Sequence, residues 1–439
     1  NTVPTFQWQR DAVDIAGATG SSYTITNAIQ GSAGTYRVIV TNAGGSVTSS
    51  PTILAVIDRS LLNLLSQVTV AASGSVSASF TVEGGAKNIL IRGVGPSLTG
   101  AAVQLADPRL TLVNGSLAMI ATNDDWGAPQ SVTGGPAPAT ASAIAAAIAA
   151  VSASPGLAIG SKDAALLIAL APGTYTVVLD GVGGTGGRAQ LEVVDADTGL
   201  WPRFAMLAMR GPVTGDKHLI VGFNLAGTVT RKYLIRVLGE SLGVNENNDN
   251  GVLVDPVNTL YRGESVIASN DDSGPDSVVD AAAAAAGAQK RIGYDAEDFH
   301  TLDSTLFLDL QPGSYTADIR PFSAPTQSGE VLFEIFSVDD LHPAEIAPAI
   351  TWLSPNQRAL NGADAALGVV AVAKPAATFR WRKNGVPIAN SDSISGSQSS
   401  VLKLFNVQAA DAGATYDVVI TSGTTTVTSP QRMISVLPL

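Results

Sequence analysis

The chain has 439 residues, of which 45% are hydrophobic and only 14% charged, and its formal net charge is −12. This length exceeds what one hydrophobic core usually holds, so about three or four domains are expected. The acidic balance and the lack of a basic stripe argue against nucleic-acid binding. No run of bulky apolar residues predicts membrane insertion, and the absence of cysteine excludes disulfides and thiol nucleophiles.

The first strand-like segments of the chain return near its end. Residues 6–10 read FQWQR and residues 33–41 read AGTYRVIVT; residues 379–383 read FRWRK and residues 412–421 read AGATYDVVIT. Alternation of apolar and polar residues is typical of half-buried strands. We therefore predict the same kind of β domain at both ends.

The middle of the chain is also doubled, with matched segments roughly 140–150 residues apart, the size of a domain. These segments are 89–93 with 233–237, 107–108 with 255–256, 120–125 with 267–272, 170–176 with 310–316, and 189–194 with 331–338. Each copy also contains an alanine-rich stretch, 139–153 or 280–287. Alanine has the highest helix propensity, so each stretch predicts one short helix, with a disordered loop as the alternative.

The two ends resemble bacterial immunoglobulin-like domains. The residues that carry the resemblance are Trp8 and Trp381, at the end of strand C, and Tyr36 and Tyr416, at the corner that opens strand F. The resemblance implies that each tryptophan packs at the centre of a sandwich and that each tyrosine hydroxyl ties down the corner. The last domain has one extra residue before Tyr416, which affects the geometry of that loop.

In antibody-type domains the position two residues after this tyrosine holds a disulfide cysteine. Here it is Val38 or Val418, so an apolar core is expected instead. Trp8 would lie on the third strand, so two strands' worth of chain is expected before Asn1. Two interpretations stay open: the chain is a fragment of a longer array, or a neighbouring subunit supplies a strand by β-strand addition. Both predict a contact surface at the open end, formed by Phe6, Trp8, Tyr36 and Val38.

The middle repeats resemble the pre-peptidase C-terminal domain, a β-sandwich repeat of large secreted bacterial proteins. The residues that carry this resemblance are the Asn-Asp-Asp turns at 123–125 and 270–272, the Pro-Gly-x-Tyr-Thr turns and the closing strands. The resemblance implies a jelly-roll-like accessory domain that does no chemistry itself. The fold class predicted for the chain is therefore all-β, a tandem array of four β-sandwich domains. Their predicted ranges are 1–57, 58–199, 200–342 and 343–439.

The Asn-Asp-Asp turns are also candidate metal sites, because Ca²⁺ binds six to eight hard oxygen ligands in flexible geometry. Calcium is the one cofactor that the sequence suggests. The candidate ligands are Asn123, Asp124, Asp125, Asn270, Asp271 and Asp272. Asp107, Asp163, Asp255 and Asp303 recur at matching places and could complete such sites. The alternative is Asx-turn chemistry, in which these side chains cap their own backbone.

Two motifs suggest catalysis or nucleotide binding, and the sequence around each favours a turn. Residues 239–243 fit Gly-x-Ser-x-Gly, but a loop follows where a nucleophile elbow needs a helix. Residues 181–186 fit Gly-x-Gly-x-x-Gly, but a strand follows where phosphate binding needs a helix N-terminus. We therefore predict no catalytic residues and a Gly-rich hairpin loop at 181–186.

The sequence predicts a structural or interaction protein of the bacterial cell surface or extracellular matrix: a stalk, an adhesin segment or a filament subunit. Its expected partners are copies of itself or neighbouring domains. The alternative function is a carbohydrate-binding or docking region of a secreted hydrolase, with polysaccharide as the partner. That alternative needs exposed aromatic side chains, for which Trp126, Trp201 and Trp352 are the candidates.

Overall fold

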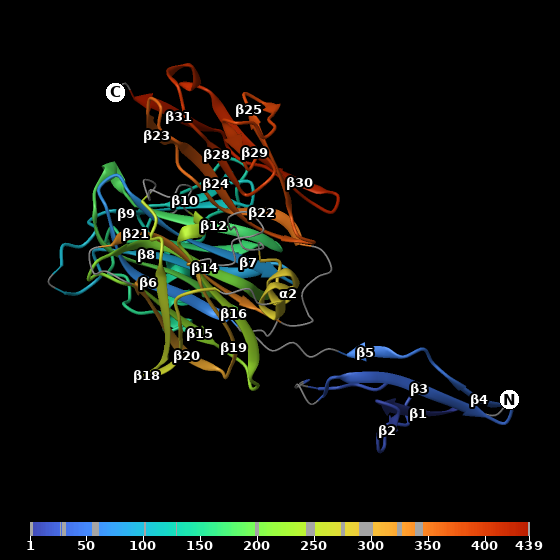
Figure 1. Ribbon diagram of the computed structural model, residues 1–439. Helices are drawn as coiled ribbons and strands as arrows, with labels where there is room; N and C mark the ends of the chain where they lie inside the picture. The colour runs from blue at the N-terminus through green and yellow to red at the C-terminus, as the bar shows by residue number, and fades with distance from the viewer. Residues whose placement is uncertain are drawn as a thin grey trace. The chain divides into compact units, whose positions relative to one another are not determined.

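Figure 1 shows the computed structural model of the chain. The structure describes residues 3–26, 28, 32–54, 61–100, 102–128, 130–197, 202–242, 251–273, 277–288, 302–322, 327–338 and 346–437. By their contacts these residues divide into two compact units, 1–58 and 59–439. Within the described ranges, no helix has the length and apolar character needed to cross a membrane.

The first unit is built on one antiparallel sheet. Its strands are β1 (Thr5–Arg10), β2 (Val13–Asp14), β3 (Gly34–Asn42), β4 (Gly45–Thr48) and β5 (Thr52–Leu54). Their order is β2-β1-β3-β4, with β5 also paired to β3. Trp8 lies opposite Val38 and Phe6 lies opposite Val40, so the apolar side chains of β1 and β3 share one face of the sheet.

The second unit begins with the two middle repeats, which have the same strand sequence. The first repeat contains β6 (Leu61–Val70), β7 (Ser75–Glu83), β8 (Lys87–Val94), β9 (Pro108–Asn114), β10 (Met119–Asn123), β11 (Ala164–Leu170), β12 (Gly173–Gly181) and β13 (Gly187–Asp195). The second contains β14 (Arg203–Thr214), β15 (Leu219–Leu225), β16 (Arg231–Leu238), β17 (Pro256–Arg262), β18 (Ser265–Asn270), β19 (Ser304–Leu310), β20 (Gly313–Pro321) and β21 (Ser328–Ser337).

The two repeats share their sheets. In the first repeat β6-β13-β8-β11 form one sheet and β7-β12-β9-β10 the other; in the second, β14-β21-β16-β19 and β15-β20-β17-β18 do the same. Strand β7 also pairs with β14, and β6 pairs with β15. We call these two pairings the repeat junction. They are equivalent by pseudo-two-fold symmetry, since Phe80 lies opposite Leu207 in one and Phe223 opposite Leu64 in the other.

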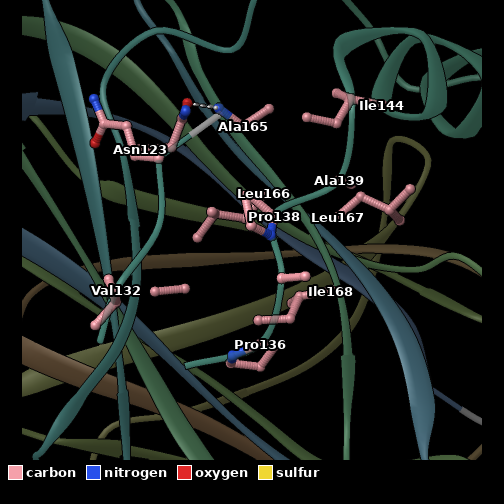
Figure 2. Close-up of a pocket in the computed structure, with 13 residues that line it drawn as sticks. Asn123, Val132, Pro136, Pro138, Ala139, Ile144, Ala165, Leu166, Leu167 and Ile168 are labelled. Atoms are coloured by element: carbon pink, nitrogen blue, oxygen red, sulfur yellow. Dashed lines mark hydrogen bonds between the residues drawn. The ribbon is translucent and has the colours of Figure 1, made fainter. Parts of the chain in front are cut away.

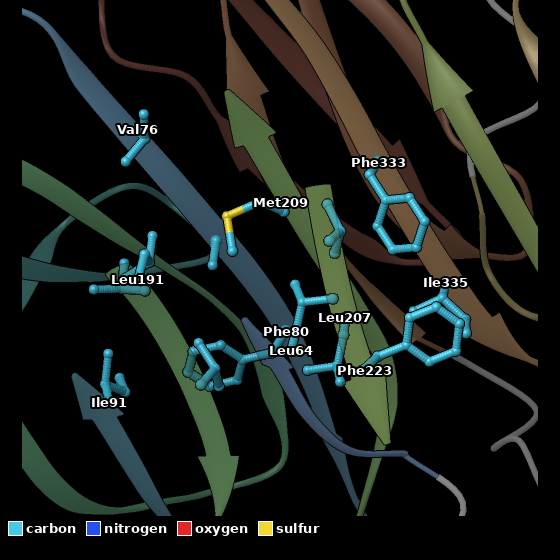
Figure 3. Packing of buried hydrophobic residues seen from close by; sticks show 14 of the residues in the cluster. Leu64, Val76, Phe80, Ile91, Leu191, Leu207, Met209, Phe223, Phe333 and Ile335 are labelled. Carbon is cyan, nitrogen blue, oxygen red and sulfur yellow. The ribbon is translucent and has the colours of Figure 1, made fainter. Parts of the chain in front are cut away.

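One hydrophobic core runs through both repeats across the repeat junction. Phe80, Leu207 and Phe223 are all buried in it, and Figure 3 shows them beside Leu64 and Phe333. The Phe80 ring meets Phe204 edge-on with centroids 5.8 Å apart, and Phe223 stacks on Tyr315 at 5.6 Å. The repeats are therefore packed as one body.

Both alanine-rich stretches contain the predicted helices, α1 (Ala141–Ala150) and α2 (Ser277–Ala285). Helix α1 begins after Thr140, whose Oγ1 accepts the Ala143 N–H at 3.2 Å and so satisfies one unpaired donor of the first turn. It buries Ile144 and Ile148, four residues apart, in an apolar cluster with Leu90 and Trp126.

The Pro-Gly-x-Tyr-Thr turns connect strands of opposite sheets, and the same tyrosine hydrogen bond closes both. The Tyr175 hydroxyl donates to the Ala171 carbonyl at 3.0 Å, and Tyr315 donates to Gln311 at 2.7 Å. Strands β11 and β12 pair with β8 and β7 respectively, so the turn carries the chain across the sandwich.

The C-terminal domain is a complete two-sheet sandwich. One sheet has the order β22-β24-β28-β27; the other has β23-β31-β29-β25-β26, with β30 beside β29. The strands are β22 (Ile346–Leu353), β23 (Gln357–Leu360), β24 (Ala365–Lys374), β25 (Thr378–Lys383), β26 (Val386–Pro387), β27 (Ile394–Ser395), β28 (Val401–Leu404), β29 (Thr415–Ser422), β30 (Thr425–Thr428) and β31 (Arg432–Leu437). Trp381 and Val418 are fully buried at its centre, as predicted. Tyr416 is also buried, but its hydroxyl makes no hydrogen bond, so the predicted corner bond is wrong for this domain.

The C-terminal domain packs on the outer face of the repeats. Ala349 and Trp352 of β22 belong to one apolar cluster with Met206 of β14 and Leu332 and Phe336 of β21. The predicted all-β array of sandwiches is thus confirmed. The domain boundaries at 57, 199 and 342 remain predictions, although strands on either side of 199 hydrogen-bond to each other.

We predict that Leu207→Ala weakens the whole second unit, because Leu207 is fully buried at the repeat junction. Truncation of a buried leucine leaves a cavity and costs about 2–5 kcal/mol of unfolding free energy. Urea denaturation measures this loss. Val266→Ala is the control, since Val266 is 58% exposed; equal effects of the two substitutions would show that the repeat junction contributes no core.

Candidate functional site

The open face of the first unit is formed by Phe6, Trp8, Tyr36 and Val38. All four side chains are only partly buried. Among the described residues of this unit, the aromatic ring that covers the face is that of Tyr23. Its ring centroid lies 6.2 Å from those of Trp8 and Tyr36.

Local hydrogen bonds hold the two aromatic side chains of this face in place. The Trp8 indole N–H donates to the Gly20 carbonyl at 3.1 Å. The Tyr36 hydroxyl donates to the Ser32 carbonyl at 2.7 Å, which is the tyrosine corner that the sequence predicts. The face is therefore held in the geometry of an immunoglobulin-like sheet.

The C-terminal domain shows the same face with a second sheet packed on it. Trp381 pairs with Val418 as Trp8 pairs with Val38, and Phe379 pairs with Ile420 as Phe6 pairs with Val40. Trp381 and Val418 have no exposed surface and belong to one core cluster with Leu367 and Val369 of β24. Among the described residues, the matching face of the β1–β3 sheet has no second sheet packed on it, and it stays the predicted contact surface.

The Asn-Asp-Asp turns use their asparagines to hold the backbone. Asn123 is buried; its Oδ1 accepts the Ala165 N–H at 3.0 Å, and its amide donates to the Asp125 carbonyl at 3.0 Å. In the second repeat Asn270 Oδ1 accepts the Thr305 N–H at 2.8 Å. Each asparagine therefore ties the end of β10 or β18 to the neighbouring strand β11 or β19, which is the Asx-type role.

One aspartate of the first turn, Asp125, and the nearby Asp107 are paired with a lysine. Lys162 Nζ lies 3.2 Å from Asp125 Oδ2 and 3.6 Å from Asp107 Oδ2. The hydrogen bond to Asp125, and then the charges of Asp107 and Asp125, raise the pKa of Lys162. Asp124 accepts a hydrogen bond from the Gln130 amide.

The matching position of the second repeat carries no charge. Leu302 stands there, one residue before Asp303, as Lys162 stands one residue before Asp163. Burial and the neighbouring Asp272 and Asp271 carboxylates raise the pKa of Asp255 to about 6. Among the described residues, no group of three or more His, Asp or Glu side chains is arranged to hold a metal ion. Calcium at the six turn residues stays a prediction.

Asp163 and Asp303, which the sequence offered as further metal ligands, hold the two Gly-x-Ser turns. Asp303 Oδ1 accepts the Gly239 N–H at 2.8 Å, and its Oδ2 accepts the Ser241 hydroxyl. Asp163 makes the same bonds to Gly95 and Ser97. The carboxylate thus organises the turn backbone in both repeats.

The Gly-x-Ser-x-Gly serine is therefore a structural residue. Ser241 is buried in a short 3₁₀ turn, Glu240–Leu242, with its hydroxyl bonded to Asp303. The first glycine of each turn is required because the chain packs too closely there for a side chain. A Cβ on Gly239 would lie 2.0 Å from the Leu253 carbonyl oxygen, and a Cβ on Gly95 would lie 2.1 Å from the Leu105 carbonyl oxygen.

The Gly-rich segment 181–186 connects β12 to β13 through a 3₁₀ turn, Val182–Gly184. Because β12 and β13 belong to opposite sheets, it is a crossover between sheets rather than the predicted hairpin loop. A strand follows these glycines, as expected.

Two of the three tryptophans proposed for carbohydrate binding are buried, which corrects the expectation that they could be exposed. Trp126 is 7% exposed and donates to the Ala158 carbonyl at 3.2 Å. Trp352, on β22 of the C-terminal domain, is 7% exposed where that domain packs on the repeats, with the Arg210 guanidinium 5.9 Å from its ring. Trp201 lies outside the described residues. A sugar-stacking surface at Trp126 or Trp352 is therefore not supported.

A small cavity lies beside Asn123, beneath the segment 132–139 (Figure 2). Its lining is mainly apolar, with Val132, Pro138, Ile144 and Leu166 among the contributors. It encloses about 20 Å³, which is enough for about one water molecule. This cavity is too small for a substrate or a sugar.

Comparison with solved structures finds partial similarity to immunoglobulin domains of other proteins. No protein-family model matches the chain, and no curated protein matches it significantly. Among solved structures, titin M4 is 24% identical, with 22% of this chain and 100% of that chain covered and a TM-score of 0.20. The tandem Ig repeats of Dlar are 14% identical, with 50% and 90% covered and a TM-score of 0.20.

We predict that Asp255→Asn stabilises the protein above pH 6. Folding raises the pKa of Asp255, so stability falls as pH rises from about 4 to about 6, and the loss persists above. The substitution removes this penalty, and we expect a gain of about 1 kcal/mol or less after allowance for solvent screening. Thermal unfolding at pH 4 and pH 7.5 measures it.

Asp107→Asn is the matched control for this prediction, because Asp107 has Lys162 as a partner. We expect Asp107→Asn to give no gain at pH 7.5. Equal gains in stability from both substitutions would show that the raised pKa of Asp255 does not set the second repeat apart from the first.

Proposed function

We propose that the chain is a non-catalytic structural and interaction segment of a secreted or surface-attached bacterial protein, and that its first unit binds by β-strand addition. One observation supports this most directly. The β1–β3 face carries the residue pattern and register of the β25–β29 face, but its tryptophan, tyrosine and valine are only partly buried.

The expected occupant is a pair of extended apolar strands equivalent to β22 and β24. In the C-terminal domain β24 supplies Leu367 and Val369 to the core around Trp381. Such strands would bury the Trp8 face, and burial of apolar surface contributes about 25 cal/mol per Å². We propose that another copy of the chain covers this face, so that the protein assembles end to end.

The rest of the chain supports a mechanical role. The repeats share a core, and the C-terminal domain packs on them through an apolar cluster that contains Trp352 and Phe336. If the repeats are related to the pre-peptidase C-terminal domain, as the sequence suggests, an extracellular location follows for this chain. In this proposal the second unit acts as a rigid spacer between interaction ends.

We predict that the chain forms concentration-dependent assemblies and that Trp8→Asp abolishes them, because a charge on the face opposes its burial. Analytical ultracentrifugation and negative-stain imaging measure assembly. Ile53→Asp is the matched control, since Ile53 lies in the same sheet and is 78% exposed. A wild-type chain that stays monomeric at all concentrations, or equal loss in both variants, would overturn the proposal.

A further inference from the structure

A lysine and an aspartate form a dry ion pair inside the first repeat. Lys87 Nζ lies 2.6 Å from Asp195 Oδ1, and the two side chains are 0% and 1% exposed. Ile89, the residue opposite Asp195 in the β8–β13 pairing, faces the core, and so does Val193. Lys87 and Asp195 therefore lie on the core side of the sheet, diagonally across from each other.

Several neighbours hold the lysine of this pair in place. Lys87 Nζ also donates to the Pro202 carbonyl at 3.0 Å and lies 5.5 Å from the centre of the Phe204 ring. A second carboxylate, Asp197 Oδ2, lies 3.6 Å from Nζ and accepts the Asn88 N–H at 3.0 Å. A buried amine and a buried carboxyl are thus in contact, with a second, partly exposed carboxylate beside the amine.

We propose that Lys87 and Asp195 condense to an intramolecular amide. Proton transfer within the pair gives a neutral amine and a carboxylic acid. The Nζ lone pair forms a bond to Cγ of Asp195, a C–Oδ bond breaks, and the hydroxyl leaves as water with a proton that Asp197 carries from nitrogen. The products are one amide and one water molecule, and no other reactant is needed.

Physical chemistry favours this step at this place. Two charges buried in an apolar interior carry a desolvation penalty, which a neutral amide removes. Fixed proximity of the reacting groups replaces a costly bimolecular encounter. The other buried pairs of the described residues, Arg92–Glu192, Arg236–Glu334 and Arg203–Glu83, cannot react in this way because they present guanidinium groups.

The second repeat provides an internal comparison. Arg231 and Ser337 stand at the positions of Lys87 and Asp195, so the reaction is confined to the first repeat. The amide would join β8 to the end of β13, next to the segment that leads into β14. A covalent bond there would resist separation of these strands under load.

The test is the intact mass of the unfolded chain, which is independent of the assembly proposed above. We expect the wild type to be lighter than its sequence by one water molecule, and peptide mapping to recover Lys87 joined to Asp195. Lys87→Arg should show the full mass. Asp195→Asn should lose one ammonia molecule instead of water, because the same attack then expels an amide nitrogen.

Two further variants complete the design. Lys162→Arg, which alters an exposed ion-paired lysine, should keep the loss of one water. Asp197→Ala should slow bond formation, seen as a mixture of the two masses in freshly purified protein. A full sequence mass in the wild type after prolonged incubation, or a mass loss that persists in Lys87→Arg, would overturn the proposal; should Lys87→Arg fail to fold, Asp195→Asn decides it.

Discussion

The structure of the second unit depends on backbone hydrogen bonding between edge strands at the repeat junction. A sandwich edge exposes unpaired N–H and C=O groups, which attract other strands. Here β7 pairs with β14 and β6 with β15, so each repeat covers two edges of the other. This closure joins two small cores into one and leaves β10, β11, β18 and β19 as the outer strands.

Sequence duplication predicted the two repeats but not the way they join. The matched segments, the Pro-Gly-x-Tyr-Thr turns and both alanine-rich helices follow from local patterns of the kind that Tyr175 and Tyr315 illustrate. Edge pairing leaves no comparable pattern, because a half-buried edge strand and a half-buried central strand have the same alternation. Only the long apolar run of 203–209, RFAMLAM, hints at a strand covered on both faces.

Residue type alone predicted the candidate sites, whereas the roles of their residues depend on where the fold buries them. Asn123 and Asp303 offer oxygen ligands in sequence, yet both are buried with their oxygens bonded to backbone N–H groups. Burial could not be read from short polar motifs such as these. The same holds for Trp126, whose position outside the repeat pattern suggested exposure although it packs on α1. The partly buried Trp8 face, by contrast, followed from its likeness to the Trp381 segment.

Differences between the repeats explain why the C-terminal domain packs on only one of two equivalent faces. Pseudo-symmetry relates Met206, Arg210 and Leu332 under that domain to Asn63, Gln67 and Gln190 on the opposite sheet. The first set supplies Met206 and Leu332 to an apolar cluster with Trp352, whereas Gln67 is exposed to water. Apolar packing requires a contiguous apolar surface. The polar side chains on the face that carries Asn63, Gln67 and Gln190 interrupt such a surface, so a second sandwich domain does not pack there. The duplicated framework therefore retains its symmetry in the core, while its surfaces have diverged toward one fixed attachment.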